Sequence, residues 1–594
     1  MLLAATAMTG VMATSAAAAA GGVVLHSSVG QLKDEGTVNV QALSAAQHAS
    51  AQVGNSSDGL AGARIIPLRQ FHALPTNFAT ANTANHPRPT AVASVNTKPV
   101  SQGFIGLSHY DQRILADNGN QFSLEPPDQA LAVGDGFEVE AVNDVLEVYG
   151  PDGKALLPAP LSMNQFFNQP SQYNRTNGQY GPFLSDPRAY FDWQTGRFIV
   201  AEWATLNDAQ GHPLNISVQF LAVSATSDPT GSWHIYSYDT TNSGTDGCPC
   251  IPDFNQLGGD ANGVFITSSL FSMSSGSFEG SRTYVVPKHA IENGASTYVA
   301  AFPVMPNDFT IHPTVAVPHG YYASELNGTE YFVETTDDLT VDGTSNILNI
   351  WAASGTNTLN SGSPSLTLTN TPLTTETVDA NLPHALQKDG YRPLGGYQHG
   401  GLHDPLPMLD AGDGRVGSTP LYVNGVLNGN TGTIWAVAGT AAIQRDGSNH
   451  DSVAWFQVST TGTPTSSTVN LVHDGIISAP NDADLLYPAI AMDTTGHGGI
   501  GVTLTDVNRY PSTAYIRMPE YSRPAIVIEG LGKLPDDGFT AYGQYGGRGV
   551  GRWGDYGAAE IDGKGNLWFA NEYIPPRQRS SLANWGTFIT KVLP

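Results

Sequence analysis

The stretch that decides the fold runs from residue 186 to residue 203 and reads DPRAYFDWQTGRFIVAEW. It opens with Asp186 and Pro187, continues through a short apolar run, turns at Asp192 and Gly196, and ends in a second apolar run. Apolar runs of this length, bounded by Asp and Gly turns, are typical of strands that are buried between sheets. The stretch therefore predicts two consecutive strands joined by a tight turn.

The same unit recurs seven times along the chain. The units open at Asp128, Asp186, Asp253, His312, Asp404, Tyr487 and Asp555. Their spacing leaves room for four strands each, which predicts a single all-β propeller of seven blades, with insertions in the two longest intervals. A tandem array of β-sandwiches is the alternative, but no Pro/Ser-rich linker separates the units. The terminal run 585–592 is expected to be a last strand that helps to close the ring.

The first hundred residues differ in composition from the rest. Residues 1–20 are apolar and end in an alanine run, which predicts an export signal and a secreted protein. Residues 21–103 are rich in Ala, Ser, Thr, Asn and Gly without apolar periodicity, so we expect a low-complexity linker or pro-segment that is disordered or poorly packed. The propeller is predicted to span residues 104–594.

Composition and charge exclude several classes of function. The formal net charge of −26 would repel polyanions, so no nucleic-acid partner is expected. No segment approaches the length of a membrane span in apolar residues. The signatures His-Glu-x-x-His, Gly-x-Ser-x-Gly and Gly-x4-Gly-Lys-Ser/Thr are absent from the sequence. Zinc proteases, elbow-type serine hydrolases and nucleotide-binding enzymes are therefore disfavoured.

Two cysteines, Cys248 and Cys250, are the only ones in the chain. Two thiols cannot supply a four-ligand zinc site, and a catalytic redox pair usually has two intervening residues. A tight disulfide and a free thiol pair both remain open. In either case we expect these residues to pin a loop.

The candidate catalytic residues are the first residues of the repeat units. The innermost strands of a propeller line its central channel, so the opening residues should share one mouth of that channel. The candidate catalytic residues are Asp128, Asp253 and Asp555, with His312 or Tyr487 as the base of a lyase variant. Paired carboxylates can cleave a glycosidic bond, and several together can bind Ca²⁺. Each Asp can instead have a structural role, because Asp at a strand start commonly accepts backbone N–H bonds.

Residues beside these carboxylates could grip a substrate. Arg can bind a carboxylate with two bonds and Trp can stack on a sugar ring. The alternative is a cation–π and salt-bridge contact that closes the last blade. His403, in a Gly-rich loop with His399, could join an acid–base or metal set. The candidate substrate-binding residues are Arg188, Arg552, Trp553, Tyr556 and His403.

The stretch 226–233, TSDPTGSW, resembles the Asp-box of sialidase-like propellers, with one extra residue between Asp228 and Gly231. The resemblance implies the fold of the secreted bacterial β-propellers in the broad sialidase-like group, not a substrate. The function expected from all these features is an extracellular glycan-processing enzyme, either a hydrolase or a lyase. The alternative is a non-catalytic secreted or cell-surface propeller that binds a glycan or Ca²⁺.

Overall fold

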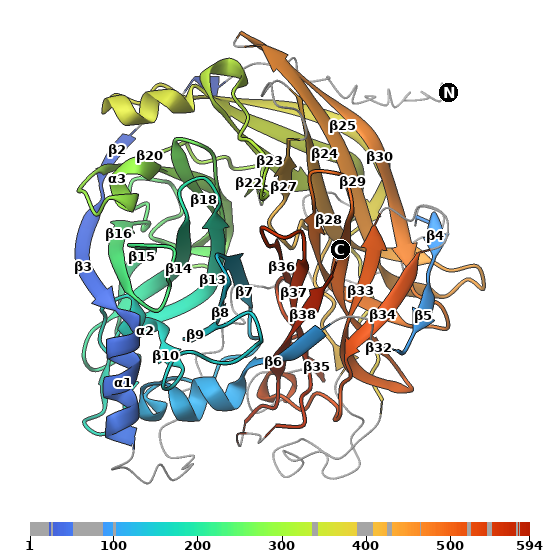
Figure 1. The fold of residues 1–594 in the computed structure, drawn as a ribbon, viewed down its shortest axis with the longest axis horizontal. Helices are drawn as coiled ribbons and strands as arrows, with labels where there is room; N and C mark the ends of the chain where they lie inside the picture. Colours follow the sequence, from blue (N-terminus) through green and yellow to red (C-terminus); the bar gives the residue numbers. More distant parts are fainter. Residues whose placement is uncertain are drawn as a thin grey trace, which may run out of the picture.

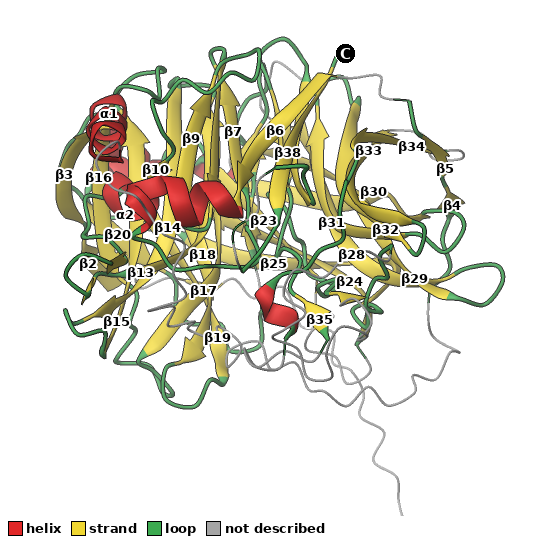
Figure 2. Cartoon of the chain, turned by 90° about the horizontal axis from the view of Figure 1, so that it is seen from below, coloured by secondary structure: helices red, strands yellow, loops and turns green. Residues whose placement is uncertain are grey.

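The computed structural model describes residues 23–24, 28–51, 87–98, 102–309, 311–335, 343–388, 408–424, 431–463, 465–518, 524–542, 549–577, 580 and 582–593. These residues form an all-β ring of sheets around a central axis (Figure 1). Figure 2 shows strands through most of the molecule and the helices α1 (Val40–Ala51) and α2 (Met163–Phe166) together near one edge, while α3 (Lys288–Glu292) follows strand β19. Among the described residues, no helix is long and apolar enough to cross a membrane.

Seven sheets of four to six strands make up the ring. The first three contain β7 (Ala130–Gly134), β8 (Phe137–Val142), β9 (Val145–Tyr149) and β10 (Leu161–Ser162); β13 (Phe183–Asp192), β14 (Arg197–Asn207), β15 (Pro213–Ser224) and β16 (Ser232–Asp239); and β17 (Cys250–Gly259), β18 (Gly263–Ser272), β19 (Phe278–Pro287) and β20 (Tyr298–Ala301). The fourth and fifth contain β21 (His312–Pro313), β23 (Thr329–Thr335), β24 (Thr344–Ser354) and β25 (Thr367–Asp379); and β22 (Val315–Ala316), β27 (Leu421–Val423), β28 (Thr431–Ile443), β29 (Asn449–Thr463) and β30 (Ser466–Ser478). The last two contain β31 (Asp484–Met492), β32 (Gly498–Asp506), β33 (Arg509–Met518) and β34 (Ala525–Gly530); and β36 (Ala558–Ile561), β37 (Leu567–Tyr573) and β38 (Gly586–Val592).

The innermost strands contact one another in sequence around the channel. β7 contacts β13, β13 contacts β17, β17 contacts both β21 and β22, and β27 contacts β31. β31 then contacts β36, and β36 returns to β7. The first and last sheets therefore meet, which is the closure of a propeller.

The blade count differs from the prediction: the structure has six blades, not seven. The repeat of strand pairing is interrupted at the unit that opens at His312. Its β21 pairs with β23 in the fourth sheet, but β22, which begins two residues after β21 ends, pairs in parallel with β27 in the fifth sheet. We attribute the difference to this shared inner segment, because it joins the inner edges of the fourth and fifth sheets, so that these two of the seven sheets are not separate blades.

The unit predicted to open at Asp404 also differs from the prediction. Asp404 itself lies outside the described residues. Met408 and Leu409, which follow it, form β26 (Met408–Leu409) and pair in parallel with β35 (Val550–Gly551) in a separate two-stranded sheet. Another small sheet joins β11 (Tyr173–Asn174) to β12 (Gln179–Tyr180). The described part of the Asp404 unit, β26, is therefore not the inner strand of a blade.

The N-terminal segment forms the outer edge of the ring in its described parts. Six of its strands lie on the outside of six sheets, so the described parts of this segment are paired with the propeller. Five of them are β1 (Val23–Val24), β2 (Ser28–Gln31), β3 (Lys33–Asn39), β4 (Ala91–Val92) and β5 (Ser94–Asn96), the outermost strands of the fourth, third, second, fifth and sixth sheets (Figure 1). The chain is too polar there to signal strands, because an edge strand needs little apolar surface: of the seven residues of β3, only Val38 is buried.

The last sheet is completed from both ends of the chain. β38 (Gly586–Val592) pairs with β37 on one side and with β6 (Gln102–Ser108) on the other. This pairing confirms that the run 585–592 contributes a closing strand. β6 begins at Gln102, two residues before the predicted start of the propeller.

The Asp-box-like stretch forms the turn between β15 and β16. Asp228 Oδ1 accepts a hydrogen bond from the backbone N–H of Thr230 at 3.0 Å, and Trp233 Nε1 donates to the carbonyl of Pro229 at 2.8 Å. Trp233 is fully buried in the core between the first two sheets. The motif therefore locks a hairpin, as the sialidase-like resemblance implies.

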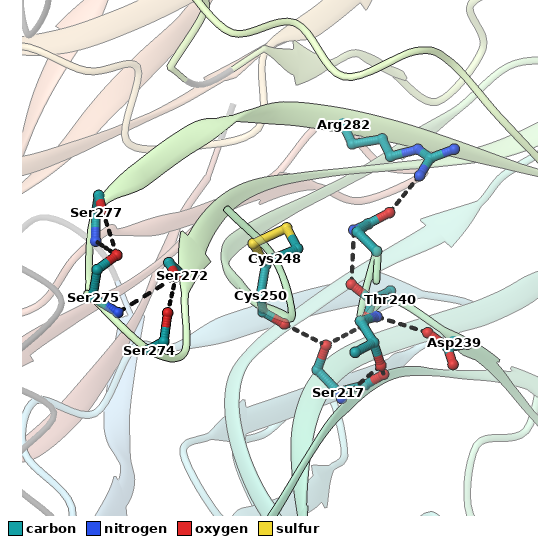
Figure 3. Close-up of a disulfide and its surroundings, with 12 residues drawn as sticks. Ser217, Asp239, Thr240, Cys248, Cys250, Ser272, Ser274, Ser275, Ser277 and Arg282 are labelled. Atoms are coloured by element: carbon teal, nitrogen blue, oxygen red, sulfur yellow. Dashed lines mark hydrogen bonds between the residues drawn. A yellow bond between two sulfur atoms is a disulfide. The ribbon is translucent and has the colours of Figure 1, made fainter. Parts of the chain in front are cut away.

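Cys248 and Cys250 form a disulfide (Figure 3). The loop before it is held by hydrogen bonds: Ser217 Oγ donates to the carbonyl of Cys250 at 2.8 Å, and Asn242 Nδ2 donates to the carbonyl of Thr240 at 2.7 Å. Arg282 also bonds Asn242. The cysteines therefore pin the loop that leads into β17, which is the structural role expected for them.

Candidate functional site

The inner strands share a backbone irregularity close to where the repeat units open. β13, β17 and β31 each shift register against their neighbouring strand, at residues 185–188, 253–256 and 486–489. One residue in each shift has a left-handed φ: 61° at Asp186, 52° at Phe254 and 47° at Tyr487. A bulge of this kind re-aims side chains, and a left-handed φ is costly for an aromatic residue. The channel-facing turn is thus a strained feature that the sheets hold in place.

This irregularity corrects the register of the third unit. The residue equivalent to Asp186 and Tyr487 is Phe254, which has the left-handed φ, and not Asp253, which precedes it. Asp128, just before β7, has a similar φ of 48°. The opening residues are therefore not all carboxylates in one register, because the third position carries an aromatic ring.

Three of the predicted carboxylates still gather at the channel. One oxygen each of Asp128, Asp186 and Asp555 lies within 4.8 Å of the others. Arg552 Nη2 donates to Asp555 Oδ2 at 2.6 Å, and both side chains are mostly buried. Burial alone would lower the pKa of Arg552, but the charges of Asp555, Asp128 and Asp410 raise it above its usual value. The guanidinium is therefore the counter-charge of this cluster.

The carboxylate of Asp186 accepts hydrogen bonds from neighbouring residues of the second and third sheets. Its Oδ2 accepts hydrogen bonds from Trp203 Nε1 and from the backbone N–H of Phe254, both at 2.9 Å. Its Oδ1 accepts from Ser185 Oγ at 2.9 Å. The carboxylate thus ties the second sheet to the third, which is the structural role that the sequence left open for each Asp.

Asp128 is buried in the same cluster but makes fewer bonds. Its Oδ2 accepts from Asn143 Nδ2 at 2.7 Å, while Asn143 Oδ1 accepts from the backbone N–H of Asp186 at 2.8 Å. Its Oδ1 is buried with no hydrogen-bond donor among the described residues. Burial, with the charges of Asp555 and Asp186, raises the pKa of Asp128 well above its usual value. The surroundings of this carboxyl therefore favour its protonated form more than water does.

Asp253 lies close enough to the cluster for the charges of Asp186 and Asp555 to affect its pKa. It is 5% exposed. Burial, followed by the charges of Asp186 and Asp555, raises its pKa well above the usual value. Asp253 is not within the 4.8 Å group, so it flanks the cluster and does not complete it.

Arg188, Tyr556 and Trp553 are all buried. The Arg188 guanidinium lies 3.2 Å from the centroid of the Tyr556 ring, and Tyr556 OH donates to the carbonyl of Pro187 at 2.9 Å. Trp553 and Tyr556 each have 0% exposure. Arg188 and Tyr556 form a cation–π contact between the second and last sheets. Because Trp553 and Tyr556 are both buried, neither ring offers an exposed face to a sugar.

His312 is also buried, with 0% exposure, and its ring meets Phe254 edge to face at 5.8 Å between centroids. Neither ring nitrogen has a hydrogen-bond partner among the described residues. Burial, aided by the charges of Arg188 and Arg415, lowers the pKa of His312 well below its usual value. The imidazole is therefore neutral and faces an apolar ring. His403 and His399 lie outside the described residues.

A small pocket of about 20 Å³ opens beside the cluster. Such a volume holds about one water molecule and is too small for a sugar ring. Sequence reasoning missed Arg415, whose Nε donates to Asp413 Oδ1 at 2.6 Å and whose guanidinium lies 4.0 Å from the Phe254 ring centroid. It follows no repeated pattern, so no signal pointed to it. The polar side chains of the pocket belong to Asp413, Arg415, Tyr487 and Asp555.

The cluster fits a cation only in part. Ca²⁺ takes about 6–8 oxygen ligands, and three carboxylates are a suitable start. However, the Asp186 oxygens already accept three hydrogen bonds and Asp555 is paired with Arg552. A bound cation would have to compete with the guanidinium.

Comparisons with known proteins give no family for this chain. No family matches the sequence, and no curated protein matches it. Solved structures similar to the chain include a protein of unknown function from Dyadobacter fermentans, with 9% identity, a TM-score of 0.30, and coverage of 68% of this chain and 94% of that one. The Trypanosoma rangeli sialidase in complex with sialic acid has 8% identity, a TM-score of 0.33, and coverage of 84% and 60%. An exo-β-1,3-galactanase from Clostridium thermocellum has 10% identity, a TM-score of 0.25, and coverage of 83% and 97%.

Proposed function

We propose that the chain is a secreted glycan-processing enzyme that hydrolyses a glycosidic bond at the acidic end of the propeller channel. One observation carries the proposal: Asp128, a buried carboxyl whose pKa is raised, and Asp555, a carboxylate paired with Arg552, each have an oxygen within 4.8 Å of the other. Two carboxyl groups in unlike environments are the usual way in which proteins divide acid from base. The disulfide is in keeping with export, since disulfides persist in oxidising compartments.

The short separation favours the retaining route. Retaining glycosidases place their two carboxyl groups about 5–5.5 Å apart, whereas inverting enzymes need about 6.5–9.5 Å. In this scheme the site has to open to admit a sugar ring, which the pocket of about 20 Å³ does not hold. Asp128 then gives its proton to the glycosidic oxygen as the bond to the anomeric carbon breaks. The carboxylate of Asp555 bonds the anomeric carbon, and a water then cleaves that ester while Asp128 takes up the proton of the water. The small pocket beside Asp555 would hold this water.

The test is a panel of polysaccharides incubated with the wild type, Asp555→Asn and the control Asp152→Asn, whose side chain lies in an exposed turn. We expect the wild type and the control to release reducing ends from at least one polysaccharide. Asp555→Asn should be slower by about 10²–10⁴-fold. Formation of unsaturated uronates would show a lyase in place of a hydrolase. If the wild type cleaves none of the polysaccharides, the proposal that the protein is an enzyme is refuted.

A second candidate is a non-catalytic propeller that binds Ca²⁺ at the same cluster, favoured by the three carboxylate oxygens that lie within 4.8 Å of one another. Here Ca²⁺ should raise the unfolding temperature and a chelator should reverse the gain, while Asp128→Asn removes the effect of Ca²⁺. An unfolding temperature that neither Ca²⁺ nor a chelator moves would exclude this candidate.

A further inference from the structure

A second pocket lies at the opposite end of the inner strands. Its volume is about 400 Å³, which is within the usual range of small-molecule sites. The side chains that matter for its chemistry are those of Gln194, Asn262, Tyr321, Tyr322, Asn327 and Asn357.

The position of the pocket follows from the strands that lead to it. β13 runs from the Asp186 end of the channel to Asp192, and Gln194 lies in the turn just beyond it. At about 3.3 Å per residue, Asp186 and Asp192 are about 20 Å apart along the strand. Asn262 lies in the equivalent turn, between β17 and β18. The pocket is therefore separate from the acidic cluster.

The walls of the pocket are held in place before any ligand arrives. The side-chain amide of Asn262 donates to Thr356 Oγ1 at 3.1 Å and accepts from Asn360 Nδ2 at 3.3 Å. The backbone N–H of Asn262 donates to Asp260 Oδ1 at 2.8 Å. A polar group fixed in this way loses little freedom on binding.

The charges behind the pocket are neutralised within the protein. Lys288 Nζ forms a buried ion pair with Asp192 Oδ2 at 2.6 Å. Tyr322 OH donates to Asp192 Oδ1 at 2.9 Å, and Lys288 Nζ donates to Tyr322 OH at 3.2 Å. Tyr322 thus separates a closed, neutral network from the pocket.

We propose that this pocket binds a neutral sugar unit of an oligosaccharide. None of the described residues that line it carries a charge, so the pocket offers nothing to pair with an anionic ligand. Amide side chains can donate to one hydroxyl and accept from its neighbour. Tyr321 is 44% exposed, and its ring gives an apolar face on which a sugar can stack.

Isothermal titration with neutral cello-, xylo-, manno- and galacto-oligosaccharides tests this proposal. We expect the wild type to bind at least one of them, and Tyr321→Ala to bind it about ten-fold more weakly. Asn357→Ala should weaken it by about three- to ten-fold, because one hydrogen-bonding amide is lost. The matched control is Asn177→Ala, an exposed amide in the turn between β11 and β12, which should bind as the wild type does.

Asp555→Asn separates this site from the proposed catalytic one, because it should bind the oligosaccharide as tightly as the wild type does. Loss of turnover with binding retained would support two separate sites. The proposal is overturned if the wild type binds no neutral oligosaccharide, if Tyr321→Ala binds as well as the wild type, or if sialylated or uronic acid oligosaccharides bind more tightly than neutral ones in a manner that Tyr321→Ala weakens.

Discussion

The two ends of the inner strands differ in charge and in access. At one end Asp128, Asp186 and Asp555 lie together, Asp555 is paired with Arg552, and the adjoining pocket has a volume of about 20 Å³. At the other end neutral amides and tyrosines line a pocket of about 400 Å³. The same strands thus carry a closed, charged site and an open, neutral one.

The difference shows how one framework can support two kinds of chemistry. Like charges in a buried site raise one another's pKa, which favours proton transfer. A neutral, hydrated pocket has no such effect and suits recognition of hydroxyl groups. Changes at the acidic end should therefore alter stability and its pH dependence, whereas changes at the open end should alter binding alone.

The largest effect is expected for Arg552→Met. The variant removes the ion-pair partner of Asp555, and a positive charge near Asp128, in a mostly buried site. Breaking a buried ion pair by removing one partner costs about 3–5 kcal/mol in the free energy of unfolding. Urea unfolding at neutral pH measures this loss.

The control for Arg552→Met is Lys33→Met, which breaks an ion pair whose lysine side chain is 69% exposed. Its effect should stay within about 0.5 kcal/mol. Equal losses in the two variants would show that the buried charges at the channel are not coupled to folding.

A smaller and pH-dependent effect is expected for Asp128→Asn. The folded-state pKa of Asp128 lies well above 3.8, its usual value, so this group opposes folding increasingly as pH rises above 3.8. As pH rises above 3.8, the free energy of unfolding of the variant should increase relative to that of the wild type by on the order of 1 kcal/mol per pH unit. Below the usual pKa both should be equally stable. Unfolding curves across pH measure the difference, and parallel curves for the two proteins would contradict it.

The smallest effect on stability is expected for Tyr321→Ala at the open end. The residue is 44% exposed, so the free energy of unfolding should change by less than about 0.5 kcal/mol at every pH. A loss similar to that of Arg552→Met would show that the open pocket is a structural element in place of a binding surface. Thermal unfolding at acid and neutral pH measures this.

Much of the ring could be predicted from the sequence, because strands such as β13 and β14 are apolar and bounded by clear turns. The outer strands could not, since β3 is almost entirely polar and gains its partner only from β16. The channel carboxylates Asp128 and Asp555 were predicted to share a mouth, and they lie together. The one-residue shift at Phe254 was missed, because a bulge leaves no mark in an apolar pattern.

The neutral pocket was not predicted at all. Gln194, Asn262 and Tyr321 come from turns and loops of different sheets, so no spacing along the chain connects them. The burial of aromatic side chains could not be predicted from the sequence either. Trp553 and Tyr556 were expected to face a substrate, and both are buried. Only the packing of the second sheet against the last one decides which side of such a ring is covered.

The central claim is that the channel holds a protonated Asp128 beside an Asp555 that is paired with Arg552. The infrared difference spectrum between the wild type and Asp128→Asn at neutral pH tests it most directly, because a protonated carboxyl has its own C=O stretching band. We predict that this band is present in the wild type and missing from the variant. A difference spectrum that shows only the loss of an ionised carboxylate would contradict the account.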